Sequence, residues 1–173
     1  MKHRHIFLTG FMCAGKSTVG TLLARTFGLD FIDTDQLIVQ RQCMDINSIF
    51  AHYGEEYFRV CETLVLQELD AAPAATPKVI STGGGIVCRD ENLRLMHQLG
   101  TVVYLHAPWD TLKQRLENVS DRPLARQGCT ERLANLWQQR LPLYRGADIE
   151  IDTHGLSSHQ VVAQLIVRLK PFA

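Results

Sequence analysis

The residues best suited to chemistry lie near the start of the chain and have the spacing of a phosphate-binding loop. Residues 10–17 read GFMCAGKS and match the pattern G-x-x-x-x-G-K-[ST], between a predicted strand and a predicted helix. Glycines let successive backbone N–H groups point at phosphate oxygens, and the start of the helix adds the positive end of its dipole. A chance strand–turn–helix is the alternative, and this context argues against it. The sequence therefore predicts a nucleoside triphosphate site, although the loop alone does not separate a kinase from a GTPase switch or an ATPase.

Two carboxylates follow the second predicted strand at a spacing of two residues. Asp33 and Asp35 stand at the carboxyl end of that strand, where ligands of open α/β sheets bind. One carboxylate could face a metal ion, and the other could face a substrate hydroxyl. Asp35 could instead cap the helix that follows, and capping is compatible with a functional role.

Glycines and arginines supply the remaining candidates. Three glycines, Gly83–Gly85, follow the third predicted strand and would let a ligand come very close, although a plain turn is the alternative. Arg59 lies beside two aromatic residues early in a long predicted helix, so it could point into a pocket or lie on a solvated face. Arg122 lies between two predicted helices, in a segment that could close over a transferring phosphoryl group.

These residues need a scaffold that brings strand ends together, and the pattern of the chain predicts one. Short β-type runs alternate with helical patterns, and three of the runs are almost continuously apolar, as in strands buried on both faces. This alternation predicts a parallel α/β sheet with helices on both faces. The predicted strands are His5–Thr9, Asp30–Ile32, Lys78–Ser81, Thr101–His106 and Ile149–Asp152. The predicted helices are Gly15–Phe27, Asp35–Gln42, Asp45–His52, Glu55–Leu69, Asn92–Leu99, Trp109–Glu117, Glu131–Arg140 and Ser158–Leu169.

Length and composition narrow the class of protein. The 173 residues suffice for about one domain with a substantial core. Eighteen basic and eighteen acidic side chains balance, which excludes a polyelectrolyte and argues against a polybasic surface for nucleic acid. Thirteen of the basic residues are arginines, which suit bidentate contacts with carboxylates and phosphates. Neither a signal peptide nor a membrane span is predicted, and five scattered cysteines indicate reduced thiols, so we expect a cytoplasmic protein.

Taken together, the motifs resemble those of the shikimate kinase family, whose members are similar to nucleoside monophosphate kinases. The resemblance spans nearly the whole chain and is specific because all the motifs occur in one order. It implies a three-layer P-loop NTPase fold, with a five-stranded parallel sheet of order 2-3-1-4-5. It also implies one domain over residues 1–173, with a substrate-binding region at about 33–61 and a lid at about 112–127. The motifs that carry it are the phosphate loop, Asp33-Thr34-Asp35, Gly54 to Arg59, Gly83–Gly85, Arg122-Pro123-Leu124 and Arg140 to Tyr144.

The resemblance also implies an activity: the Mg²⁺-dependent transfer of a phosphoryl group from ATP to the 3-hydroxyl of shikimate. The products would be shikimate 3-phosphate and ADP, in the biosynthesis of chorismate and the aromatic amino acids. We expect ATP and shikimate as partners, a monomer, and no nucleic acid or membrane partner.

Site residues are implied by the same resemblance. The catalytic residues would be Asp35, Lys16 and Arg122. Arg115 would stack on adenine, and the full ATP-binding set would be Cys13, Ala14, Gly15, Lys16, Ser17, Thr18, Arg115 and Arg122. Two arginines would hold the substrate carboxylate, and the full substrate-binding set would be Asp35, Arg59, Gly83, Gly84, Gly85 and Arg140. The metal would be held by Ser17 and Asp33.

Two positions depart from the family pattern. Cys13 occupies the fourth loop position, where the family usually has glycine, so its side chain could strain the backbone or crowd the phosphates. A thiol beside the start of a helix could also be reactive. Ser157 stands about where family members can place a long side chain against adenine.

Three alternatives stay open beside this interpretation. A gluconate kinase of the same fold would also use two arginines for a carboxylate, but the motif over residues 33–35 together with the glycines at 83–85 favours shikimate. A nucleotide-dependent switch would need a base-reading N-K-x-D segment, which the sequence lacks. A catalytically silent scaffold is disfavoured because the chain retains Lys16, Ser17, Asp33, Asp35 and Arg122, and only Cys13 favours it.

Overall fold

A sheet of five parallel strands forms the centre of the protein. The computed structural model describes residues 5–71, 76–118 and 129–169. The strands stand in the order β2-β3-β1-β4-β5, so the expected order is confirmed. Their bounds are His5–Thr9 (β1), Asp30–Asp33 (β2), Lys78–Ser81 (β3), Gly100–His106 (β4) and Ile149–Asp152 (β5).

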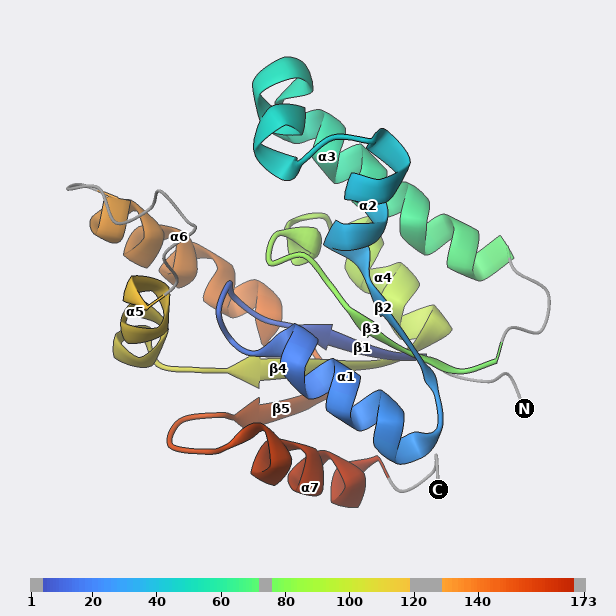
Figure 1. Cartoon of the computed structure of the whole chain (residues 1–173), viewed down its shortest axis with the longest axis vertical. Helices are drawn as coiled ribbons and strands as arrows, with labels where there is room; N and C mark the ends of the chain where they lie inside the picture. The colour runs from blue at the N-terminus through green and yellow to red at the C-terminus, as the bar shows by residue number, and fades with distance from the viewer. Residues whose placement is uncertain (1–4, 72–75, 119–128, 170–173) are drawn as a thin grey trace.

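Helices cover both faces of the sheet and complete a three-layer fold (Figure 1). On one face α1 packs against α7, and on the other α3 packs against α4. Most helix bounds match the predicted ones to within a few residues. The helices are Lys16–Phe27 (α1), Thr34–Gln42 (α2), Ile46–Ala71 (α3), Asp90–Leu99 (α4), Trp109–Glu117 (α5), Cys129–Tyr144 (α6) and Ser158–Arg168 (α7).

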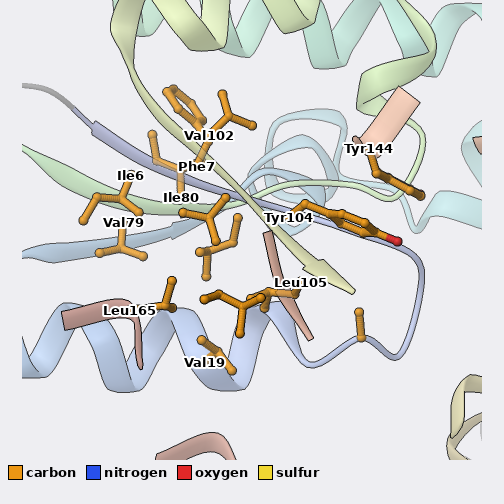
Figure 2. Close-up of a cluster of buried hydrophobic side chains, with 14 of the residues drawn as sticks. Ile6, Phe7, Val19, Val79, Ile80, Val102, Tyr104, Leu105, Tyr144 and Leu165 are labelled. Carbon is orange, nitrogen blue, oxygen red and sulfur yellow. The ribbon is translucent and has the colours of Figure 1, made fainter. Parts of the chain in front are cut away.

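The central strands are buried because their apolar side chains meet helices on both sides. Ile6 and Phe7 of β1 and Val79 of β3 have no exposed surface, and they belong to one continuous core (Figure 2). The parallel register pairs Leu8 with Ser81 across β1 and β3. This pairing places the carboxyl ends of the two strands, and the loops that follow them, next to each other.

A second, smaller apolar cluster stabilises the region between β2 and β3. Its buried members come from α2 and α3 and are Ile38, Ile49, Phe58, Cys61 and Val65. Within α3 the backbone of Gly54 is not helical, with φ of 82° and ψ of 168°. The prediction of two separate helices on either side of this glycine is therefore confirmed.

Two local features differ from the sequence-based expectation. The helix expected to end at Arg140 continues to Tyr144, with Pro142 inside its last turn. Proline usually ends a helix, but here Tyr144 is buried, so tertiary packing overrides that tendency. A short 3₁₀ helix (η1, Ile86–Cys88) follows the glycines after β3. In the described ranges, no helix is long and apolar enough to cross a membrane.

Candidate active site

The phosphate loop joins β1 to α1, and its backbone requires glycine at two positions. Gly10 has a φ of 142°, and a Cβ atom there would lie 2.7 Å from the carbonyl oxygen of Leu105. Gly15 has a φ of 94° and directly precedes α1. The Lys16 ammonium lies over the loop and donates to the carbonyl oxygens of Gly10 and Phe11, at 2.9 Å each. The loop and the start of α1 therefore have the geometry of an anion site.

The expected backbone strain at Cys13 is confirmed. Its φ is 62°, a left-handed conformation that costs a non-glycine residue about 1–2 kcal/mol. Its carbonyl oxygen accepts a hydrogen bond from Nη1 of Arg115 at 3.2 Å. The side chain is partly exposed and lines the cavity beside the loop. The cysteine therefore changes both the backbone energy of the loop and the wall of the cavity.

A cavity of about 370 Å³ lies beside the phosphate loop, which is the size of a small-ligand pocket. After β5 it is lined by Leu156 and Ser158, whereas Ser157 caps α7 and its hydroxyl accepts the Gln160 N–H at 3.3 Å. The position beside the cavity that was expected for Ser157 is therefore occupied by Leu156 and Ser158. Five of the predicted ATP-binding residues also line the cavity, namely Cys13, Ala14, Gly15, Thr18 and Arg115.

Ser17 and Asp33 meet where the phosphate loop passes the carboxyl end of β2. The Ser17 hydroxyl donates to Oδ2 of Asp33 at 2.8 Å and lies 3.4 Å from the hydroxyl of Ser81. Mg²⁺ accepts hydroxyl and carboxylate oxygens and completes its shell with water and phosphate oxygens. The pair therefore fits a Mg²⁺ ion that binds together with a nucleotide. In the part of the chain that the structure describes, no group of three or more His, Cys, Asp or Glu side chains could hold a metal by itself.

The three residues that end β2 and begin α2 hold neighbouring parts of the site. Asp33 makes the helix cap that the sequence offers to Asp35, because its Oδ1 accepts the N–H groups of Asp35 at 3.1 Å and Gln36 at 3.3 Å. Asp35 faces Gly83 instead, where a Cβ atom would lie 2.5 Å from Asp35 Oδ1. Between them, the buried Thr34 hydroxyl accepts the Gly83 N–H at 3.1 Å.

Glu62 of α3 is a fully buried carboxylate beside Asp35. Its Oε2 accepts a hydrogen bond from Nη1 of Arg59 at 2.8 Å. Its Oε1 has no hydrogen-bond partner among the described residues and lies, like Asp35 Oδ1, 2.5 Å from the position of a Cβ at Gly83. Burial raises the pKa of Glu62 to about 7, the charge of Arg59 opposes this rise, and Asp35 adds to it. Beside Asp35 the site therefore contains a second carboxyl group, that of Glu62, and the raised pKa of Glu62 means that it ionises with difficulty.

Arg59 ends inside this cluster and not on a solvated face. Its side chain is 11% exposed, and Nη2 pairs with Glu55 at 2.6 Å while Nη1 pairs with Glu62. Burial opposes the positive charge, but Glu62 and Glu55 raise the pKa of the guanidinium above its ordinary value. A Cβ at Gly85 would lie 2.3 Å from this guanidinium, so the glycine leaves the room that it needs. A fixed guanidinium beside a glycine loop is suited to binding a carboxylate.

Arg140 reaches the same glycine loop from α6. It is buried, and its Nη1 donates to the carbonyl oxygen of Gly84 at 3.4 Å. Its Nε has no hydrogen-bond partner among the residues that the structure describes. A Cβ at Gly84 would lie 3.5 Å from the carbonyl oxygen of Gly10 in the phosphate loop. The glycine loop is therefore the point at which the arginine–carboxylate cluster meets the phosphate loop.

The predicted site residues fall on two adjacent loops and the elements around them. The phosphate side holds Lys16, Ser17, Asp33 and the cavity, and the other side holds Asp35, Arg59, Arg140 and Gly83–Gly85. Arg122 lies outside the described residues, and so does the expected lid beyond residue 118.

Three residues of the site were given no role by sequence reasoning: Thr34, Glu62 and Tyr144, although Thr34 and Tyr144 lie in motifs that carry the family resemblance. A signal for Glu62 does exist, because it lies on the buried stripe of α3, four residues after Phe58 and three before Val65. A charged residue on an apolar stripe points to a buried partner. Thr34 and Tyr144 carry no such local signal, since their contacts involve residues far away in the chain.

Comparisons with known proteins agree with one another. A family model described as Shikimate kinase matches residues 12–170. A shikimate kinase of Geobacter sulfurreducens is 43% identical over 163 residues, which cover 94% of this chain and 88% of that protein. Another, of Thermodesulfovibrio yellowstonii, is 39% identical over 167 residues and covers 94% and 93%. The structure of shikimate kinase from Acinetobacter baumannii in complex with shikimate superposes with a TM-score of 0.86 at 35% identity, covering 98% of this chain and 94% of that one.

Proposed function

The chain belongs to the shikimate kinase family and is a phosphotransferase with an alcohol group as acceptor, and from this membership we propose that it transfers the γ-phosphoryl group of ATP to the 3-hydroxyl of shikimate. The products are shikimate 3-phosphate and ADP, and the reaction serves the biosynthesis of chorismate and the aromatic amino acids. The observation that carries the proposal is the cluster of Asp35, Arg59 and Arg140 around a glycine loop that touches the phosphate loop.

On the acceptor side, the cluster offers a partner for each kind of group on shikimate, a cyclohexene carboxylate with three hydroxyls. Arg59 and Arg140 bind the carboxylate through charge-assisted hydrogen bonds, together with the glycines at 83–85. Glu62 and Glu55 hold the Arg59 guanidinium in place. Asp35 accepts hydrogen bonds from ring hydroxyls, orients the 3-hydroxyl and takes its proton as the bond to phosphorus forms.

On the donor side, the chain positions ATP and neutralises charge, which is most of what phosphoryl transfer requires. The backbone of the phosphate loop and Lys16 bind the phosphates, and Arg115 packs against adenine in the cavity. Ser17 and Asp33 would hold Mg²⁺, which when bound neutralises charge on the β- and γ-phosphate oxygens. Arg122 closes over the transferring group and excludes water, which would otherwise accept it.

The same proposal covers the organisation of the chain. Residues 1–173 form one kinase domain, with a substrate-binding region at about 33–61 and a lid at about 112–127. The second apolar cluster, between α2 and α3, supports a separate role for the first of these regions. We propose a cytoplasmic monomer whose partners are ATP and shikimate, with no nucleic acid or membrane partner.

A coupled assay of ADP release from Mg–ATP tests this function with three acceptors: shikimate, gluconate and none. We expect ADP release with shikimate well above the other two. A faster reaction with gluconate than with shikimate would favour a gluconate kinase. The same rate of ADP release with and without an acceptor would favour an ATPase or a switch. No ADP in any arm would leave a silent scaffold. Lys16→Ala is the control that should abolish the rate in every arm.

Asp35→Asn is expected to lower kcat about 10²–10⁴-fold, because it removes the proton acceptor while keeping the shape of the side chain. ATP binding, measured by calorimetry, should change less than twofold. The matched control is Asp70→Asn, an exposed carboxylate in the last turn of α3, which should leave both values unchanged. Near-normal turnover of Asp35→Asn would remove Asp35 from the reaction.

A further inference from the structure

Tyr144, in the last turn of α6, reaches the glycine loop that follows β3, sixty residues earlier in the chain. Its hydroxyl donates to the carbonyl oxygen of Gly84 at 2.5 Å, the same oxygen that Arg140 approaches at 3.4 Å. The side chain is 1% exposed, and burial raises its pKa well above the ordinary value of tyrosine. The hydroxyl therefore keeps its proton and acts as a donor.

The ring of Tyr144 is held by a second buried tyrosine. Tyr104 of β4 stacks on it with 5.1 Å between ring centroids and an angle of 14° between the planes (Figure 2). The Tyr104 hydroxyl pairs with Nδ1 of His106 at 3.0 Å, so it serves a different partner from the Tyr144 hydroxyl. Two stacked rings in a packed core have little freedom to move, and this fixes the point from which Tyr144 donates.

The carbonyl of Gly84 belongs to the peptide group whose N–H is that of Gly85. The peptide is planar and trans, so the N–H of Gly85 points away from the Tyr144 hydroxyl. Gly84 lies against the phosphate loop, because a Cβ atom added at Gly84 would lie 3.6 Å from the backbone nitrogen of Met12. Gly85 lies against the guanidinium of Arg59. The rotation of the Gly84–Gly85 peptide therefore decides which way the N–H of Gly85 points beside Arg59.

We propose that Tyr144 is a positioning residue of this enzyme: by holding the Gly84 carbonyl, it orients the Gly84–Gly85 peptide for binding the carboxylate of the acceptor. This inference rests on the proposed function, because it names the acceptor whose carboxylate is bound. It gives the C-terminal part of α6 a second role in acceptor binding, in addition to the role of Arg140. Tyr144 itself touches neither reacting group, so its loss affects acceptor binding more than the chemical step.

The test compares Tyr144→Phe, which keeps the ring and removes the hydroxyl, with Tyr104→Phe, which removes the other hydroxyl of the same stacked pair. Each loses one part-buried hydrogen bond, so a general loss of stability affects both. For Tyr144→Phe we expect the KM for shikimate to rise about 5- to 10-fold, as for the loss of one hydrogen bond. Its KM for ATP and its kcat at saturating shikimate should change less than twofold, and Tyr104→Phe should leave all three within twofold.

Calorimetric binding of shikimate without nucleotide gives a second readout. The Kd of Tyr144→Phe for shikimate should rise by the same factor as its KM. Equal shikimate KM and Kd in Tyr144→Phe and the unmodified enzyme would overturn the positioning role, and so would an equal rise in both variants. If the unmodified enzyme shows no shikimate-dependent ADP release, the proposed function and the positioning role are both overturned. If the unmodified enzyme is active but the two variants do not differ in their KM for shikimate, only the positioning role is overturned.

Discussion

Cys13→Gly is expected to stabilise the protein, which is unusual for a substitution in a catalytic loop. Cys13 has a φ of 62° and therefore holds a Cβ atom in a conformation that glycine adopts without steric cost. Removing the Cβ should yield about 1–2 kcal/mol. Glycine also loses more conformational freedom on folding, which offsets about 0.5–1 kcal/mol of that gain. The net gain in the free energy of unfolding is about 0.5–1 kcal/mol, or about 1–4 °C in Tm for a chain of this size.

Thermal unfolding followed by circular dichroism, with urea unfolding beside it, measures this gain. Cys13→Ala keeps the Cβ and should show no increase in Tm. Cys43→Gly is the matched control, because Cys43 has a φ of 50° at the exposed end of α2. This variant should be more stable than the unmodified protein and should have an unchanged KM for ATP. A Tm for Cys13→Gly at or below that of the unmodified protein, with a gain for Cys43→Gly, would refute the assignment of strain to Cys13.

Three further outcomes follow from the arginine–carboxylate cluster. Gly83→Ala should lower kcat/KM for shikimate about 100-fold at an unchanged KM for ATP, because the added Cβ would displace the carboxylates of Asp35 and Glu62, whose oxygens lie 2.5 Å from its position. An unchanged kcat/KM for shikimate in steady-state assays would contradict this packing. Arg59→Ala should raise the KM for shikimate about 10- to 100-fold, as for a lost charge-assisted hydrogen bond, and an unchanged KM would remove Arg59 from the acceptor site. Glu62 has a pKa raised from 4.5 to about 7, so the folded state binds more protons than the unfolded state between these values and the stability falls as the pH rises. Relative to Glu62→Gln, the unmodified protein should lose of the order of 3 kcal/mol in urea unfolding between pH 4.5 and 7, and parallel curves would show that Glu62 titrates normally.

Local pattern predicts most of the elements but not how they pair. Apolar runs such as Val102–Leu105 are recognisable as buried strands in the sequence alone. The order of the strands is non-local, and its prediction depended on the family resemblance. The end of α6 was placed too early because Pro142 is a local stop signal, whereas the burial of Tyr144 against Tyr104 is a contact across forty residues.

The candidate site divides in the same way. The phosphate loop is contiguous, so its spacing alone predicts an anion-binding loop, whereas the strain at Cys13 was expected from the comparison with the family pattern. Glu62 was overlooked because glutamate on a helix is normally solvated, and its burial depends on Arg59 and on the neighbouring apolar cluster. The helix cap went to Asp33 and not to Asp35, since the choice between two acids two residues apart depends on where β2 stops.

The pairing of β1 with β3 joins the stability of the sheet to the spacing of the reacting groups. Thr82, just before the glycine loop, donates to the carbonyl oxygen of Leu8 through its N–H at 3.1 Å and its hydroxyl at 3.0 Å. The two loops that would carry donor and acceptor therefore start about 4.8 Å apart, the distance between hydrogen-bonded strands. The amide of Thr82 should exchange with solvent as slowly as the core, because it opens only when the central ladder does. Side chains on these loops can be exchanged to alter affinity or acceptor, but a change that loosens the ladder beneath them would cost folding and turnover at once.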